Sequence, residues 1–286
     1  MLFRYYFFKE GTRRYDVTDL ISYFNANPYI DILNKNEAEK VAHYFNPTLG
    51  FHCDFVIASK SSVPNIERLN PKYVEVNLKV EFDVLLPTYD VDLILNICED
   101  ICKMFNFYVY NEVFEDVSPF QRSLMLKAFD VIKLAFKNKY PQEIANYFRL
   151  DKESLNKIYD YLQQSSIISD LLKIDNVVVP KIAFYAVDGK RKIYTAIEIN
   201  STEPFVFPLF VDMVHIIDPN LDMFISSEEL YSQTKKLFHP IESSITNLYY
   251  TIPREIKKIN KILNKVKFSP LILELKKVDF SKVLDI

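Results

Sequence analysis

The strongest constraint on the fold is a strict alternation of apolar and polar residues along positions 74 to 84. The apolar positions are Val74, Val76, Leu78, Val80, Phe82 and Val84, and the polar positions between them are Glu75, Asn77, Lys79, Glu81 and Asp83. Successive side chains of a strand point to opposite faces, so this pattern predicts a strand with one buried face and one polar face. Any fold for this chain must therefore contain a sheet that is covered on one side.

The flanking segments predict an α+β unit around that strand. The expected elements are a strand at 2–8, a helix at 18–33 interrupted near Pro28, a short helix at 37–44, a strand at 51–58, a helix at 91–104 with Asp90 as its N-cap, and a strand at 107–114. This βαββαβ order is that of a ferredoxin-like antiparallel sheet with both helices on one face.

The remainder of the chain predicts helices followed by a second sheet. A capping box at 118–121 opens a helix to about 138, and two shorter helices follow at 142–149 and 152–164. Asp188 and Gly189 separate two apolar runs and predict a β-hairpin. Further expected elements are a strand at 205–217 bent at Pro208, a helix to about 238 capped by Ser226 and Glu229, a helix at 253–267 and a strand at 270–276.

The length of 286 residues is enough for two domains with separate cores. The predicted division is a ferredoxin-like domain at 1–116, a helical connector at 117–170 and a second α+β domain at 171–286, which ends with the helix at 253–267. Because the ferredoxin-like arrangement supports many activities, this prediction carries almost no functional information.

Composition excludes several classes of site. The three glycines, Gly11, Gly50 and Gly189, are isolated, so neither a P-loop nor a Rossmann fingerprint is present. G-x-S-x-G, H-E-x-x-H and kinase motifs are also missing from the sequence, and no cofactor is evident from it. The abundance of Ile, Lys and Asn indicates an AT-rich genome.

Charge and cysteine content predict the compartment. The net charge of −3 argues against a dedicated nucleic-acid binder, and three cysteines fit a reducing, cytoplasmic location. The first residues, which Arg4 interrupts, predict a strand and not a signal peptide, and no apolar window is long enough to span a bilayer.

The polar face of the predicted N-terminal sheet is the first candidate site. Alternation places there a histidine, several carboxylates, two cations and tyrosines, namely His52, Asp54, Glu75, Lys79, Glu81, Asp83, Tyr108, Tyr110, Glu112, Arg4 and Tyr6. Clustered carboxylates and a histidine can bind a divalent cation, and the metal candidates are His52, Asp54, Glu81 and Asp83. A solvated or docking face explains the same pattern.

The same face offers aromatic side chains on which RNA bases could stack, namely Tyr6, Phe8, Tyr108 and Tyr110. The carboxylates of the third predicted strand argue against this hypothesis, because they repel the phosphates of an RNA backbone, which Lys and Arg side chains would attract.

The second candidate is the helix at 253–267, whose apolar stripe is Ile256, Ile259, Leu263 and Val266. The segment carries six positively charged side chains and one negatively charged side chain, Glu255. The surface-binding candidates are Arg254, Lys257, Lys258, Lys261 and Lys265. A basic amphipathic helix binds an anionic membrane or nucleic acid, or is simply a solvated face.

Cysteines and histidines give no complete site. Cys98 and Cys102 have helical spacing but lack a second ligand pair, which favours buried thiols over zinc. His52 and Cys53 point to opposite faces of a strand, and so do consecutive members of the series Asp212, His215 and Asp218.

The sequence leaves three functions open. The preferred hypothesis is a non-catalytic, intracellular macromolecule-binding or scaffold protein whose partner is another protein. The alternatives are a metal-dependent enzyme acting on a phosphorylated or nucleotide substrate, and a peripheral membrane or nucleic-acid adaptor that uses residues 253–267. The partner, the substrate and the oligomeric state are not encoded in any recognisable motif.

Overall fold

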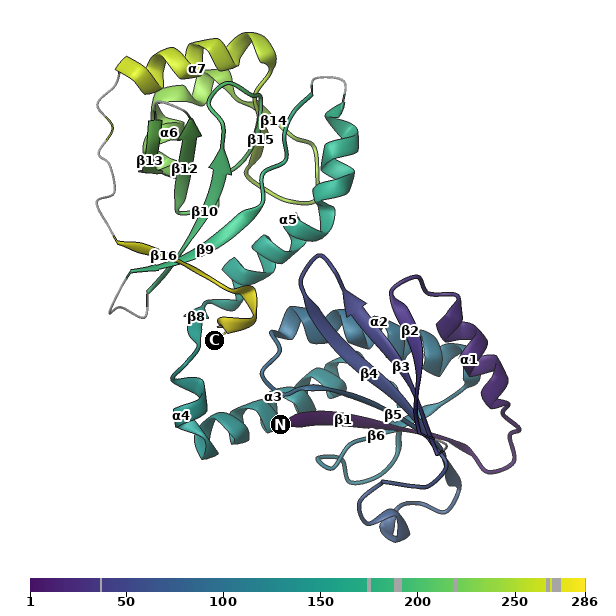
Figure 1. Ribbon diagram of the computed structural model, residues 1–286. Coiled ribbons are helices and arrows are strands. Elements are labelled where there is room, and N and C mark those ends of the chain that lie inside the picture. Colours follow the sequence, from purple (N-terminus) through teal and green to yellow (C-terminus); the bar gives the residue numbers. More distant parts are fainter. Residues whose placement is uncertain are drawn as a thin grey trace. The chain divides into compact units, whose positions relative to one another are not determined.

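The computed structural model describes residues 1–36, 38–173, 176–187, 192–218, 221–265, 268 and 274–285. The chain is a mixed α+β protein that divides into two compact units, Met1–Asn146 and Tyr147–Ile286 (Figure 1). Within the described residues there are seven α-helices and four sheets. No helix in those residues is long and apolar enough to cross a membrane.

Unit 1 contains a large antiparallel sheet with the strand order β2-β3-β4-β5-β1-β6-β7. Its elements are β1 Leu2–Glu10, α1 Val17–Asn25, β2 Ile30–Asn36, β3 Glu39–Asn46, β4 Phe51–Ala58, a 3-10 turn Ile66–Arg68, β5 Tyr73–Asp83, α2 Thr88–Phe105, β6 Tyr108–Tyr110, β7 Ser118–Pro119, α3 Arg122–Lys139 and α4 Pro141–Ile144.

The alternating segment forms β5, as predicted, and its apolar positions from Val76 to Phe82 lie in the main core of unit 1, whereas Val74 is exposed. Leu78, Val80 and Phe82 are at most 2% exposed. The helices cover this face, because Phe129 of α3 packs 6.0 Å from Phe82 and Phe24 of α1 packs 5.1 Å from Phe55 of β4, measured between ring centroids. The predicted covered face is therefore confirmed.

The prediction for residues 30 to 44 is wrong, because this segment forms the hairpin β2-β3 and not helix. The Asn36 side chain accepts a hydrogen bond from the Ala38 backbone in the turn, and β3 pairs along its whole length with β4. Pairing with an existing sheet outweighs the helix propensity of the Glu-Ala-Glu-Lys run. The element order therefore contains two strands more than the predicted βαββαβ series.

Several element boundaries in unit 1 also differ from those predicted. Helix α2 begins at Thr88 after Pro87, and Asp90 lies buried in its first turn and not at the N-cap. Ser118 pairs with Val109 as part of β7, so the capping box does not form and α3 begins at Arg122. β6 ends at Tyr110 because the Asn111 side chain donates to the Arg4 carbonyl and accepts from the backbone of Val113.

Unit 2 contains a five-stranded sheet in the order β13-β12-β10-β9-β16, with smaller sheets β11-β15-β14 and β17-β8. Its elements are β8 Phe148–Leu150, α5 Lys152–Leu171, β9 Ile182–Val187, β10 Ile193–Ile199, β11 Val206–Pro208, β12 Met213–Asp218, β13 Leu221–Ser226, α6 Ser227–Thr234, a 3-10 turn η3 Lys235–Leu237, β14 His239–Pro240, β15 Leu248–Tyr250, α7 Pro253–Lys265, β16 Leu275–Val278, a 3-10 turn Phe280–Lys282 and β17 Val283–Asp285.

The predicted hairpin is confirmed, since β9 and β10 pair antiparallel; its turn at Asp188 and Gly189 lies outside the described residues. The strand predicted at 205–217 is divided at Pro208 into β11 and β12, which belong to different sheets. The helix predicted to reach 238 ends at Thr234 and continues as η3, and Ser226 makes no side-chain cap hydrogen bond there. The strand predicted at 270–276 falls mostly outside the described residues and appears as β16.

The helices predicted as a connector are distributed between the two units. α3 and α4 lie in unit 1, whereas α5 lies in unit 2 and is longer than predicted. The segment predicted as a helix at 142–149 contains only the short α4 before β8 begins.

Replacing Phe129 by alanine should destabilise unit 1 by about 3–5 kcal/mol, because it leaves a cavity beside Phe3 and Phe82. The matched control is Leu134→Ala on the same helix, where the side chain is 59% exposed and the expected change is within about 0.5 kcal/mol. Chemical denaturation followed by circular dichroism measures both. Equal effects of the two substitutions would contradict this description of the core.

Candidate binding surfaces

The polar face of the unit 1 sheet carries a group of paired charges around Glu81. Arg4 Nε lies 2.6 Å from Glu81 Oε1, and Lys79 Nζ lies 2.9 Å from the same oxygen. Burial raises the pKa of Glu81, but the hydrogen bonds from Lys79 and Arg4 outweigh it and hold this pKa below its usual range. Glu81 therefore remains ionised and already has two cationic partners.

Asp54, one of the other three predicted metal ligands, is paired with Glu81 across β4 and β5, but the four residues do not form one group. Asp54 Oδ1 lies 2.7 Å from His43 Nδ1, and Asp83 accepts a hydrogen bond from the Leu85 backbone at the end of β5. His52 is exposed, and its ring lies 5.4 Å from that of His43. Among the described residues, no group of three or more His, Cys, Asp or Glu side chains is placed to hold a metal ion.

The aromatic platform predicted for RNA bases is covered. Tyr6 and Phe8 are 2% and 1% exposed, and they form a second hydrophobic cluster with Val63, Leu69 and Val117 from the neighbouring loops. Bases cannot stack on rings that these loops already cover, so this hypothesis is wrong for the described structure.

The cysteines lie inside unit 1. Cys53 and Cys98 are fully buried, and burial raises the pKa of both thiols; it also raises the pKa of Cys102, to about 12. Such groups are thiols at neutral pH, whereas metal binding and nucleophilic catalysis require thiolates. The predicted buried thiols are confirmed.

The evenly spaced Asp212, His215 and Asp218 have separate partners. Asp212 accepts hydrogen bonds from the backbone and hydroxyl of Thr195, and Asp218 accepts from Ser201. His215 Nε2 lies 2.8 Å from Asp222 Oδ1 on the adjacent strand. The three residues do not assemble into a catalytic group.

The basic helix predicted in the second domain is α7, which the structure describes to Lys265. Its apolar stripe faces the interior, since Ile256, Ile259 and Leu263 are at most 5% exposed. Its acidic residue, Glu255, is also buried, with Oε2 2.7 Å from His239 Nε2. The face of α7 that reaches solvent is therefore basic.

The candidate cations of α7 are all exposed, but they differ in surroundings. Arg254 lies beside Glu255, with 3.7 Å between Nε and Oε1. Lys258 and Lys261 line a pocket, and Lys257 and Lys265 do not. The sequence predicted the basic helix but did not indicate which of its lysines line a pocket.

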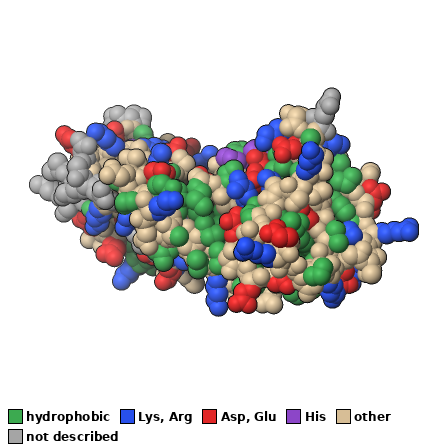
Figure 2. All heavy atoms as spheres, turned by 90° about the horizontal axis from the view of Figure 1, so that it is seen from below, with side chains coloured by type: hydrophobic (Ala, Val, Ile, Leu, Met, Phe, Trp, Pro, Cys, Tyr) green, Lys and Arg blue, Asp and Glu red, His purple; other side chains and the backbone are tan. Residues whose placement is uncertain are grey.

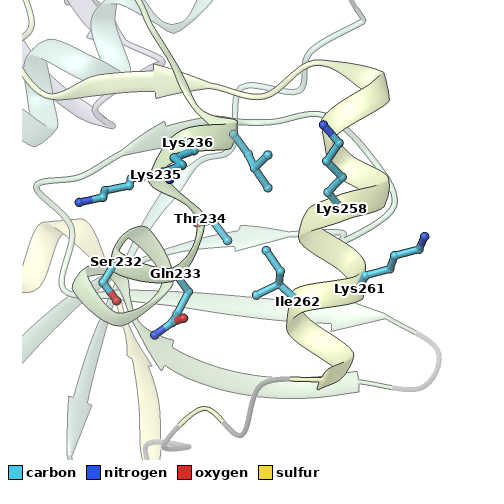
Figure 3. A pocket seen from close by; sticks show the side chains of 9 residues that line it. Ser232, Gln233, Thr234, Lys235, Lys236, Lys258, Lys261 and Ile262 are labelled. Carbon is cyan, nitrogen blue, oxygen red and sulfur yellow. The ribbon is translucent and has the colours of Figure 1, made fainter.

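The pocket lies between α7 and the segment formed by α6 and η3, and its volume is about 450 Å³. It is lined by Ser232, Gln233, Thr234, Lys235, Lys236, Leu237, Lys258, Lys261 and Ile262. Figure 3 shows Thr234 and Ile262 reaching into the space between the two elements, with the ends of Lys235 and Lys261 extending outward on opposite sides. Leu237 and Ile262 form the apolar part of the lining, here called the apolar floor, and four lysines line the same pocket.

Lys235 and Lys236 were absent from the sequence-based site, although the Lys-Lys pair near the end of the helix predicted to reach 238 was a visible signal. Their position opposite α7 depends on how the helices fold back on one another. With them, four lysines from two elements surround one pocket that no described acidic residue lines. On the face drawn in Figure 2, charges of both signs are mixed with apolar side chains.

No family model, curated protein or solved structure matches this chain.

Substituting Glu81 by glutamine should destabilise the protein by about 1–2 kcal/mol at neutral pH, because it removes charge-assisted hydrogen bonds to Arg4 and Lys79. A carboxyl whose pKa is lowered by folding stabilises the native state above its unfolded pKa, near 4.3, and loses this contribution as pH falls. The difference between wild type and variant should thus shrink from about pH 5 downward.

Denaturation at a series of pH values measures this difference, with the exposed Glu115→Gln as the control variant. A wild-type advantage that does not change between neutral and acidic pH would contradict the ion-pair explanation.

Proposed function

We propose that the protein is a non-catalytic binding protein, and that the pocket between α7 and α6–η3 binds an acidic segment of another protein. The observation that carries this proposal is the combination of four lysines and an apolar floor in one pocket. The segment it fits has an apolar side chain flanked by carboxylates.

The apolar lining and the volume of the pocket fit one apolar side chain of the partner. Leu237, Ile262 and the methylene stems of the lysines provide apolar contact, and a volume near 450 Å³ lies within the range of ligand pockets. Burying one leucine side chain in such a pocket contributes about 1.5–3 kcal/mol.

The charge of the pocket supports acidic flanking residues. Lys235, Lys236, Lys258 and Lys261 are exposed, so each pair that they form with a carboxylate contributes modestly, about 0.2–1 kcal/mol. Together they steer an acidic segment toward the pocket and discriminate against basic ones. Affinity should therefore fall as salt rises.

The burial of α7 argues against a helix that lies in a membrane. Such a helix inserts its apolar face among the lipids, whereas Ile256, Ile259 and Leu263 pack inside unit 2. Nucleic acid fits less well than an acidic protein, because the described lining residues include neither an aromatic ring nor an arginine to contact bases. Metal-dependent catalysis on the unit 1 sheet is disfavoured by the separate partners of Asp54 and Glu81.

Two further expectations belong to this proposal. A ferredoxin-like core for unit 1 is supported by the consecutive positions of β4, β5, β1 and β6 in the sheet, with β2-β3 as an added hairpin at its edge. A reducing, cytoplasmic location is supported by the three free, buried cysteines.

The double variant Lys258→Glu, Lys261→Glu should bind an acidic peptide at least roughly tenfold more weakly than the wild type, a change of about 1.4 kcal/mol. The probe is a synthetic peptide with one leucine flanked by glutamates, and fluorescence anisotropy measures its binding to the full chain at low and moderate salt. Replacing the peptide leucine by serine should also weaken binding, since the apolar contact is lost.

The control is Lys60→Glu, Lys127→Glu, which makes the same change in net charge at exposed positions of unit 1. An equal loss in the control variant would contradict the proposed site. So would binding of random-sequence DNA or phosphatidylserine vesicles together with no binding of the peptide.

A further inference from the structure

Two histidines lie side by side on the polar face of the unit 1 sheet. In the ladder between β3 and β4, His43 is paired with Asp54 and Phe45 is paired with His52. The two imidazoles are therefore diagonal neighbours, and their ring centroids are 5.4 Å apart. Both side chains reach solvent.

One of the two imidazoles is oriented by a carboxylate. His43 Nδ1 lies 2.7 Å from Asp54 Oδ1, so Nε2 is the ring nitrogen directed away from Asp54. Histidines that bind metals are typically held in this way, because the carboxylate fixes the ring and increases its basicity.

The spacing of the rings fits a shared metal ion. A zinc–nitrogen bond is about 2.0–2.1 Å long, which places the centre of a coordinated imidazole roughly 3 Å from the metal. Two imidazoles in tetrahedral positions then have centroids roughly 5 Å apart. The observed separation of 5.4 Å is close to this value.

The charges around the two rings favour a cation. Asp31 of β2 is paired with His43 on the side opposite Asp54, so carboxylates flank this imidazole in both directions along the row. The next residue in the row, Glu81, is neutralised by Arg4 and Lys79 and does not join the set.

We infer that His43 and His52 bind one divalent transition-metal ion of the class that prefers imidazole, Zn²⁺ or Cu²⁺. Asp54 is the positioning residue that orients His43, and water occupies the remaining coordination positions. With two protein ligands the site is open, in agreement with the lack of a three-residue metal cluster in the described part of the chain.

Calorimetric titration of the full chain with Zn²⁺ tests this site. We expect one site per chain, a loss of affinity of at least roughly tenfold in His52→Gln, and a loss of roughly 10–100-fold in Asp54→Asn. Binding should also weaken at acidic pH, because protons compete with the metal for imidazole nitrogen. His52 is exposed, so its replacement should leave thermal melting without metal unchanged.

The matched control is His215→Gln. His215 also has a carboxylate partner, Asp222, but no second histidine is paired with it on the neighbouring strands. Wild-type Zn²⁺ affinity in His52→Gln would overturn the inference, as would an equal loss in His215→Gln. Neither result bears on the pocket lined by Lys235, Lys236, Lys258 and Lys261, here called the lysine pocket, which the peptide titration tests separately.

Discussion

The packing of one face of each amphipathic element decides which side chains are left for binding. Along β5, Leu78, Val80 and Phe82 are buried beneath helices, and the polar positions between them are consequently directed to the other face of the sheet. Along α7, the burial of Ile256, Ile259 and Leu263 likewise turns the lysines outward. Both candidate surfaces are consequences of apolar burial.

The two surfaces differ because their charges have different partners. On the unit 1 sheet, Glu81 is neutralised by Arg4 and Lys79, and the diagonal neighbours His43 and His52 are the basis of the proposed local metal site. In unit 2, Glu255 is buried against His239, which removes the acid that would have balanced the lysines around the pocket. Unbalanced charge over an apolar floor favours recognition of an acidic partner.

The sequence predicted the parts of the fold in which local pattern and tertiary packing agree. The alternation in β5 and the apolar stripe of α7 were sufficient to predict a strand and a helix, because each pattern places apolar residues on a single face. The hairpin β2-β3 was missed because the Glu-Ala-Glu-Lys run at 37–40 favours helix, whereas β2 and β3 become strands by pairing with each other and with β4. The lysine pocket and the pair His43 and His52 were missed for a related reason, since both need contacts between segments whose distance the pattern does not encode.

The most direct test of the lysine pocket is methyl NMR of Ile262 and Leu237 during titration with the peptide that carries one leucine flanked by glutamates. These two side chains form the apolar floor, so their signals report occupancy of the pocket itself. Saturable shifts of both signals are expected, with Leu33 of β2 in unit 1 unaffected. Saturable binding that shifts Leu33 and leaves Ile262 and Leu237 unchanged would contradict the proposed binding site.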